Sequence, residues 1–397
     1  MNRSDGRRLV LRPDAVVRIE GLDRADFTWG TAGPRVTLRG ASLRVVEKFA
    51  VPQLVEHVVE AFSASAEREV IVAAIERLID AGVLVDESRA EWETAARVGL
   101  FGTPVVSVRS ALAGEADVIV VGVPFDGGVT YRPGARFGPQ GIRSVSRSVF
   151  QAAEPPRGMH DPVRGKRVME SVRVRDVGDI LPDPGGGGRR QLDDARVLAG
   201  RVAGAGKLLV ALGGDHSISA PLIAGVADSV GSIGVLHFDA HHDFSHPASG
   251  DMKGLHHGNF LNWSAGDDRV AHIVQCGIRQ LTSVDPETLD SHHVWPGRTW
   301  VDAGAESLLR TIAADIPWYV TVDVDVIDPA HMPATGTPLP GGVRWGELID
   351  VLVAVLGSRR VVGIDVVEFL PDGHDAPGLE ISALLVHAVD AAMGGRR

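Results

Sequence analysis

The chain has 397 residues, of which 44% are hydrophobic, and it carries a formal net charge of −11. This size and composition suit a soluble globular protein with one large domain or two unequal ones, and the acidic balance argues against nucleic acid or an anionic membrane as a partner. The single cysteine, Cys276, excludes a disulfide framework, and no apolar stretch resembles a signal peptide or approaches the ~20 residues that span a bilayer, so we expect a cytoplasmic protein.

The first 100 residues predict a small module of their own. Apolar residues recur at helical spacing in 52–62 and again in 69–82, and a short strand, "VLV", follows. Helix, turn, helix and strand predict a winged-helix-like α/β module over residues 1–100. Acidic residues far outnumber arginines in 52–87, which disfavours DNA binding and leaves a structural or oligomerisation extension as one interpretation.

Residues 101–397 predict a larger α/β domain. Short Val/Ile/Leu runs, typical of strands that are buried on both faces, alternate with amphipathic segments that would cover them. We therefore expect a mostly parallel sheet, with loops in the Pro/Gly-rich segments 182–191 and 333–342. The predicted strands lie in 117–126, 207–217, 232–243, 272–279, 318–329 and 360–369.

Three of these strands end in side chains that commonly bind metals. In an extended strand, residues i, i+2 and i+4 point to the same side, so the candidates within each motif would face one way, while His242 and Val324 would point elsewhere. The carboxyl ends of parallel strands are also where open α/β sheets bind ligands. The candidates are His216 in "GGDHS", Asp239, His241 and Asp243 in "DAHHD", and Asp323 and Asp325 in "TVDVDVIDP".

Carboxylates gathered in this way need a positive charge among them, because without a cation they repel one another and their pKa values rise. Two divalent ions about 3.5–4 Å apart would be bridged by carboxylates and would lower the pKa of a shared water towards neutrality. Oxygen-rich ligation with one imidazole per metal suits Mn²⁺, and a thiolate zinc site is excluded. Each motif alone could be an ordinary turn or loop, but the three together predict a binuclear centre with two Mn²⁺ per subunit.

These motifs resemble the signature blocks of the ureohydrolase family, which contains arginases, agmatinases and related amidinohydrolases. "GVPFDGGVTYRPGARFGPQGIR" (122–143) resembles a block of the agmatinase branch, and "TGTPLPGG" (335–342) resembles the loop after the third metal block. The resemblance covers about residues 117–395. It implies a three-layer α/β/α fold, two Mn²⁺ ions held by the six candidates, hydrolysis of a guanidino group to urea and an amine, and a homo-oligomer, either a trimer or a hexamer.

The resemblance also implies roles for three further side chains. "LHHGNF" (255–260) is similar to the block whose histidine moves protons near the leaving amine, which indicates His257, and a pKa of about 6.5 suits that role. "GIDVVEFLP" is similar to the block whose glutamate holds the guanidinium through paired charge-assisted hydrogen bonds, which indicates Glu368. Asp243 would orient the attacking water. Leu370 stands where the family often has asparagine.

The substrate stays open at this point. The segment 245–259 aligns with neither arginases nor agmatinases, while "SVDPETL" (283–289) resembles an arginase segment that binds the α-amino group and nominates Asp285 as substrate-binding. The N-terminal module resembles PqqD-like modules that bind leader peptides, which implies a peptide arginase that converts arginine to ornithine in an arginine-containing peptide. The alternatives are a small guanidino compound such as agmatine or guanidinobutyrate, a single-zinc deacetylase, and a non-catalytic scaffold, which the complete ligand set disfavours.

Overall fold

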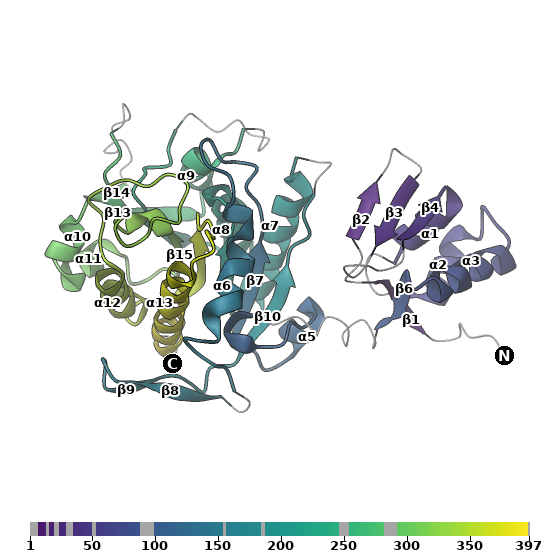
Figure 1. Ribbon diagram of the computed structural model, residues 1–397, viewed down its shortest axis with the longest axis horizontal. Helices are drawn as coiled ribbons and strands as arrows, with labels where there is room; N and C mark the ends of the chain where they lie inside the picture. The colour runs from purple at the N-terminus through teal and green to yellow at the C-terminus, as the bar shows by residue number, and fades with distance from the viewer. Residues whose placement is uncertain are drawn as a thin grey trace. The chain divides into compact units, whose positions relative to one another are not determined.

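The computed structural model of the chain (Figure 1) divides into two compact units, Met1–Arg97 and Val98–Arg397. The boundary expected from the sequence, after residue 100, lies close to this division. The residues that the structure describes are 7–12, 16–19, 24–28, 35–49, 53–87, 99–153, 156–183, 187–245, 254–281 and 292–395.

Within its described residues, the first unit combines two small antiparallel sheets with three helices around one core, to which β1, β3, β4, β6 and these helices contribute buried side chains. The two helices and the strand expected between residues 52 and 85 are present as α2, α3 and β6. The earlier strands and α1 were not predicted, because elements of four to seven residues show too few periods to stand out. The sheets are β5 (Gln53–Leu54), β1 (Arg8–Leu11) and β6 (Leu84–Asp86), and β2 (Val16–Ile19), β3 (Arg24–Thr28) and β4 (Arg35–Arg39); the helices are α1 (Ala41–Glu47), α2 (Val55–Phe62) and α3 (Arg68–Asp80).

The second unit is built on an eight-stranded sheet in which every ladder is parallel. All six strands expected from the sequence are present, and they are joined at the two edges by β10 and β14, which were not predicted. The strand order is β10 (Val174–Asp179), β7 (Val118–Val123), β11 (Leu208–Gly213), β16 (Val361–Val367), β15 (Trp318–Asp323), β12 (Ile233–Phe238), β13 (Val270–Ile278) and β14 (His292–Pro296).

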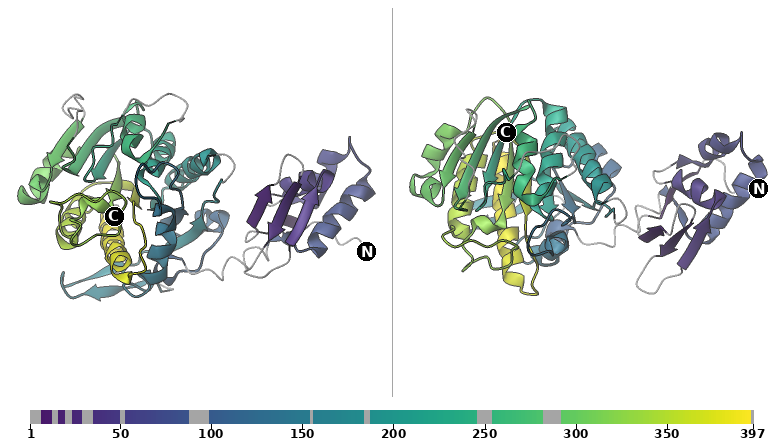
Figure 2. Two further views of the ribbon diagram at one scale, coloured as in Figure 1. Left: turned by 45° about the horizontal axis from the view of Figure 1, so that its top comes forward. Right: turned by 90° about the horizontal axis from the view of Figure 1, so that it is seen from above.

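Helices cover both faces of this sheet, which gives the expected three-layer α/β/α fold (Figure 2). Alternate residues of a strand enter different cores: Val118 and Val120 of β7 belong to one buried cluster, and Ile119 and Val121 belong to the other. The first cluster is covered by α6 (Gly138–Ser146), α10 (Thr299–Asp302), α11 (Ala305–Thr311), α12 (Trp345–Leu356) and α13 (Asp375–Gly394), and the second by α5 (Val108–Ala113), α7 (Arg189–Gly204), α8 (Ser219–Val230) and α9 (Phe260–Ala265).

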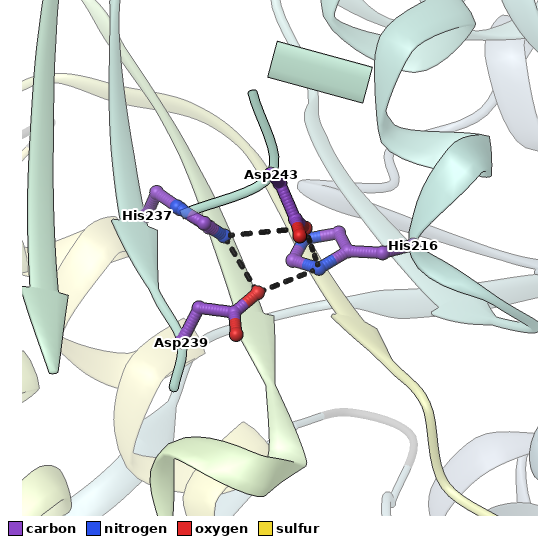
Figure 3. Close-up of side chains that lie close together, drawn as sticks. All are labelled: His216, His237, Asp239 and Asp243. Carbon is purple, nitrogen blue, oxygen red and sulfur yellow. Dashed lines mark hydrogen bonds and ion pairs between the residues drawn. The ribbon is translucent and has the colours of Figure 1, made fainter. Parts of the chain in front are cut away.

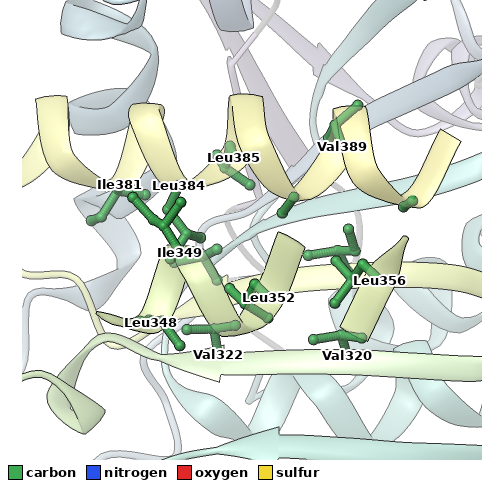
Figure 4. Close-up of a cluster of buried hydrophobic side chains, with 14 of the residues drawn as sticks. Val320, Val322, Leu348, Ile349, Leu352, Leu356, Ile381, Leu384, Leu385 and Val389 are labelled. Carbon is green, nitrogen blue, oxygen red and sulfur yellow. The ribbon is translucent and has the colours of Figure 1, made fainter. Parts of the chain in front are cut away.

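Figure 4 shows the first cluster, where Val320 and Val322 of β15 lie below the apolar face of α12, and α13 closes the layer above it. The helix α13 is long and apolar enough to cross a membrane, but 67% of its most apolar 18-residue stretch is buried inside the unit. It is therefore a core helix. The hairpin of β8 (Arg157–Asp161) and β9 (Lys166–Glu170) is attached to α13 through Lys166 and Asp390, whose charged atoms are 3.0 Å apart.

Two loop predictions fared differently. The Gly-rich segment 182–191 was expected to be a loop throughout, but α7 already begins at Arg189, because the Gly188 backbone has a φ of 79° and lets the chain turn directly into the helix. The segment 333–342 is irregular, as expected. It is anchored by an isolated bridge between Thr335 and Phe369, which brings it beside the end of β16.

Candidate metal centre

Four neighbouring strands of the large sheet lead into the residues that the sequence nominated. In spatial order, β11 leads to His216, β16 to Glu368, β15 to Asp323 and Asp325, and β12 to the segment 239–243. Because the ladders are parallel, the carboxyl ends of these strands meet at one edge of the sheet. The fold thereby brings together residues as distant in sequence as His216 and Glu368, which are 152 positions apart and share a hydrogen bond.

One group of side chains surrounds His216. Its Nδ1 atom lies 3.0 Å from Oδ2 of Asp239, 3.2 Å from Oδ2 of Asp243 and 3.3 Å from Oδ2 of Asp323. All four residues are buried, and among the described residues Nδ1 has no hydrogen-bond partner. Its other nitrogen, Nε2, is 2.8 Å from Oγ1 of Thr321, which fixes the ring. An orphaned imidazole nitrogen that faces three carboxylates fits a shared cation.

A second group surrounds His241. Its Nδ1 atom lies 2.9 Å from Oδ2 of Asp325 and 3.3 Å from Oδ1 of Asp239. Asp239 therefore points one carboxylate oxygen at each group, which is what a carboxylate that bridges two ions must do. The structure gathers all six predicted ligands into two groups that share Asp239, and this arrangement fits two metal ions better than one.

Five of the six ligands follow the strand ends, and Asp323 is the last residue of β15. β12 ends at Phe238, and Val324–Val326 is a turn of 3₁₀ helix in which the Asp325 N–H donates to Oδ1 of Asp323 at 2.8 Å. The expectation that strand alternation aligns these side chains is therefore wrong. Tight turns after the strands align them instead. His242 belongs to neither group, as expected, and its Nδ1 accepts the N–H of Phe244 at 2.9 Å.

Electrostatics in the two groups favours bound cations. Burial and repulsion by Asp325 and Asp239 raise the pKa of Asp323 well above its usual value. Burial lowers the pKa of His241, but Asp325 and Asp239 outweigh this effect and raise that pKa to about 12. The four buried carboxylates exceed the two imidazoles even if both rings are protonated, so the cluster keeps an excess of negative charge. Two divalent ions would balance the four carboxylates.

Glu368 lies beside this cluster with one carboxylate oxygen in use and the other available. Oε1 accepts the backbone N–H of His216 at 2.9 Å and lies 3.0 Å from Nδ1 of His257. Oε2 is buried and has no hydrogen-bond partner among the described residues. A Cβ atom added at Gly336 would lie 3.5 Å from Oε2, so the glycine keeps this position beside Oε2 open. Glu368 also adopts a φ of 63°, a strained backbone typical of functional sites.

His257 contacts Glu368 on one side and Thr130 on the other. The Thr130 N–H donates to Nε2 at 3.1 Å, and the Thr130 hydroxyl lies 2.7 Å from the same atom. Because a backbone N–H can only donate, Nε2 accepts it and the ring proton sits on Nδ1, facing Glu368. Burial lowers the pKa of His257, but the carboxylate of Glu368 outweighs it and raises that pKa overall. Thr130 was not predicted as a site residue from the sequence.

Two further polar residues at the site were also missed. Asp215 is buried, accepts the Gly128 N–H at 2.7 Å, and has its pKa raised to about 7 by burial and by repulsion from Glu368. His237 lies on β12 with Nε2 only 2.8 Å from Oδ2 of Asp239. Its position two residues before Asp239 was a usable signal, because alternation holds within a strand. Asp285, nominated from the sequence, lies outside the described residues.

Comparison with known proteins agrees with this fold. The model of the arginase family matches residues 116–393. Proclavaminate amidinohydrolase from Streptomyces clavuligerus is 36% identical over 64% of this chain and 80% of its own length, and agmatinase from Bacillus anthracis is 33% identical over 65% and 84%. A crystal structure of a hypothetical agmatinase from Burkholderia thailandensis superposes with a TM-score of 0.65 at 26% identity, over 76% of this chain and 92% of that one.

An α/β/α fold with a His/Asp cluster at the carboxyl edge of a parallel sheet defines a class of metal-dependent hydrolases. Within that class, this chain belongs to the arginase family. It is therefore a hydrolase of carbon–nitrogen bonds in linear amidines, and the family depends on a binuclear metal centre. The family match begins at residue 116, so the first unit, Met1–Arg97, lies outside it.

Proposed function

We propose that this chain is a cytoplasmic, homo-oligomeric amidinohydrolase that uses two Mn²⁺ ions to hydrolyse a small guanidino compound to urea and an amine. The observation that carries the proposal is the buried Oε2 of Glu368, which has no hydrogen-bond partner in the part of the chain that the structure describes and lies beside two ligand groups that share Asp239. One feature supplies an acceptor for the guanidinium, and the other supplies the ligands of a binuclear centre. Their combination at one sheet edge is the minimum that guanidino hydrolysis requires.

Glu368 would hold the guanidinium of the substrate. Oε1 already accepts the His216 N–H and contacts His257, so the substrate N–H groups must be received mainly by Oε2. This arrangement differs from the symmetric pairing expected from the sequence, in which both oxygens would serve the guanidinium equally. The bond is charge-assisted and is made to a buried oxygen, so it is strong.

The six ligands His216, Asp239, His241, Asp243, Asp323 and Asp325 would hold the two ions. When bound, such ions supply a water whose pKa is lowered enough for attack at neutral pH. Asp243 has a φ of 52°, which turns its carboxylate back towards His216 and suits it to orient that water. In the overall reaction a C–O bond forms, the C–N bond to the amine breaks, and the amine gains a proton.

His257 is placed to provide that proton. The carboxylate of Glu368 raises the pKa of His257 above its usual value, so the ring takes up a proton more readily than a free imidazole. The ring has an exposure of 11%, and its two neighbours, Glu368 and Thr130, fix its orientation. The Nδ1 proton already faces Glu368, the guanidinium acceptor, so His257 is suited to pass a proton to the departing amine.

The substrate class follows the relatives. Proclavaminate amidinohydrolase, agmatinase and N(1)-aminopropylagmatine ureohydrolase are each at least 31% identical to this chain over most of their length, and their names describe substrates that are small molecules. We therefore place a small guanidino compound, such as agmatine or guanidinobutyrate, first.

A second candidate is arginine within a peptide. The first unit favours this candidate, since it has its own core and lies outside the family match. An enzyme that acts only on small molecules has no evident use for such a unit. In that case the first unit would hold a PqqD-like, peptide-binding role and the product would be peptidyl ornithine.

A urea-release assay on the full chain with Mn²⁺ tests both candidates. The panel is arginine, agmatine, guanidinobutyrate, guanidine and an arginine-containing peptide. We expect urea from at least one compound and none from the Asp243→Ala variant. Urea from the peptide alone would favour the second candidate, and no urea from any of these compounds, with metal bound, would contradict the proposal. Sedimentation of the same sample tests the expected trimer or hexamer.

A further inference from the structure

A chain of buried polar side chains leads away from the metal centre through the sheet. His237 of β12 and Gln275 of β13 are direct neighbours in the parallel ladder, and both are fully buried. Nδ1 of His237 is 2.8 Å from Nε2 of Gln275, and Oε1 of Gln275 is 2.6 Å from Nε2 of His292 on β14. At its inner end, Nε2 of His237 is 2.8 Å from Oδ2 of Asp239 (Figure 3).

The direction of each hydrogen bond follows from one backbone carbonyl. Nε2 of Gln275 lies 3.0 Å from the carbonyl oxygen of His242, which can only accept, so this atom is the amide nitrogen. The same nitrogen donates to Nδ1 of His237, which must therefore be unprotonated. The ring proton of neutral His237 then sits on Nε2 and is donated to Asp239. Gln275 thus fixes the tautomer of His237.

This direction decides between two roles for His237. Its distances to the cluster would also allow it to be a metal ligand beside His216, Asp239 and Asp243. A ligating Nε2 must be free of its proton, which would move to Nδ1 and face the N–H of Gln275, so two donors would oppose each other. Turning the Gln275 amide over would place its oxygen against the carbonyl of His242. Both arrangements leave buried polar groups unsatisfied, which is unfavourable.

We propose that His237 is a positioning residue that orients Asp239, with its tautomer set by Gln275, and that it is not itself a ligand. The inference rests on the proposed metal centre. The donated N–H occupies one lone pair of Oδ2 and holds the carboxylate plane, so that Oδ2 stays with the His216 group and Oδ1 with the His241 group. Partners of this kind commonly change metal affinity by 10- to 100-fold.

Variants of the full chain test the proposal through Mn²⁺ binding. His237→Phe keeps a ring against Phe260, whose centroid is 5.4 Å away, but removes the donor, and we expect affinity to fall about 10- to 100-fold with two ions still bound at saturation. His237→Gln retains an amide donor and should recover most of the loss. Gln275→Leu should weaken binding in the same way.

Gln191→Leu is the matched control, since Gln191 is also buried and also donates its amide to a backbone carbonyl, that of Pro124, without contact to a ligand. It should lose stability but not Mn²⁺ affinity. Unchanged affinity in His237→Phe would overturn the inference, and so would saturation at one ion, which would make His237 a ligand. A wild-type chain that binds no divalent ion would instead overturn the proposed metal centre.

A spectroscopic measurement reads the tautomer directly. In full-length protein with ¹⁵N-labelled histidine and diamagnetic Mg²⁺, the signal lost in His237→Phe should report a protonated Nε2 and an unprotonated Nδ1. In Gln275→Leu that preference should weaken, because nothing then donates to Nδ1. A protonated Nδ1 in the wild-type protein would refute the proposal even if the variants bind metal poorly.

Discussion

Replacing Glu368 by glutamine tests the substrate site with almost no change of shape. The backbone N–H of His216 needs an oxygen acceptor, so the amide oxygen of the variant will occupy the place of Oε1. The amide nitrogen must then take the place of Oε2, where it presents an N–H to the guanidinium instead of an acceptor. The fold should tolerate the change, because a buried carboxylate oxygen that has no partner among the residues with described positions is replaced by a neutral group.

The expected loss can be worked from this geometry. One charge-assisted hydrogen bond contributes about 1.5–3 kcal/mol, and leaving the opposing donor of the substrate unpaired costs about 1–3 kcal/mol more. The sum, about 2.5–6 kcal/mol, corresponds to a fall of about 10²–10⁴-fold in kcat/KM. Steady-state urea release by Glu368→Gln, with metal content measured on the same sample, gives this number.

Asp228→Asn provides the control for an acid-to-amide change. Asp228 pairs with Arg196 and Arg269 near the C-terminal end of α8, far along the helix from the metal-binding edge of the sheet. Its kcat/KM should equal that of the wild type. If Glu368→Gln also kept wild-type kcat/KM with two ions bound, Glu368 would not hold the guanidinium and the reasoning from its free oxygen would be refuted.

Four other outcomes follow from the same contacts. Asp325→Ala should abolish urea release and lower the metal content from two ions per chain, because the His241 group loses one of its two carboxylates; full activity would contradict the site. His257→Asn should lower kcat about 10²–10⁴-fold while metal content measured by atomic absorption stays unchanged. Chelation of the ions should abolish activity and lower the melting temperature, and added Mn²⁺ should restore both. Arg298 lowers the pKa of Glu347 to about 2, so their interaction stabilises the fold above about pH 4.5 and is lost as the pH falls towards 2. The free energy of unfolding of Glu347→Gln, measured by denaturant titration, should therefore be about 1 kcal/mol lower than that of the wild type at pH 7. Near pH 2 the two values should be equal.

The sequence was sufficient for the core of the large unit and for the ligand set. Continuous apolar runs gave the six central strands, because only strands buried on both faces tolerate such composition. Polar residues directly after three of those runs gave the ligands, since parallel strands deliver their carboxyl ends to one edge. Local pattern and general topology were enough in both cases.

What the sequence could not give depends on register or on local turns. Gln275 becomes informative only when the ladder places it opposite His237, and no sequence pattern reveals that pairing. Thr130 reaches His257 across 127 positions of chain. The alignment of Asp323 with Asp325 comes from a 3₁₀ turn, which a strand-based period does not anticipate.

The backbone N–H of His216 donates to Oε1 of Glu368, and the side chain of the same histidine is a proposed metal ligand. His216 therefore connects the metal site directly to the residue that would accept the guanidinium. Any reorientation of the His216 backbone on loading with ions must therefore change how Glu368 presents Oε2. By linkage, the factor by which bound ions tighten a guanidino inhibitor equals the factor by which that inhibitor tightens the ions. Where loading with ions tightens the inhibitor, the inhibitor should raise the equilibrium affinity for the ions by the same factor.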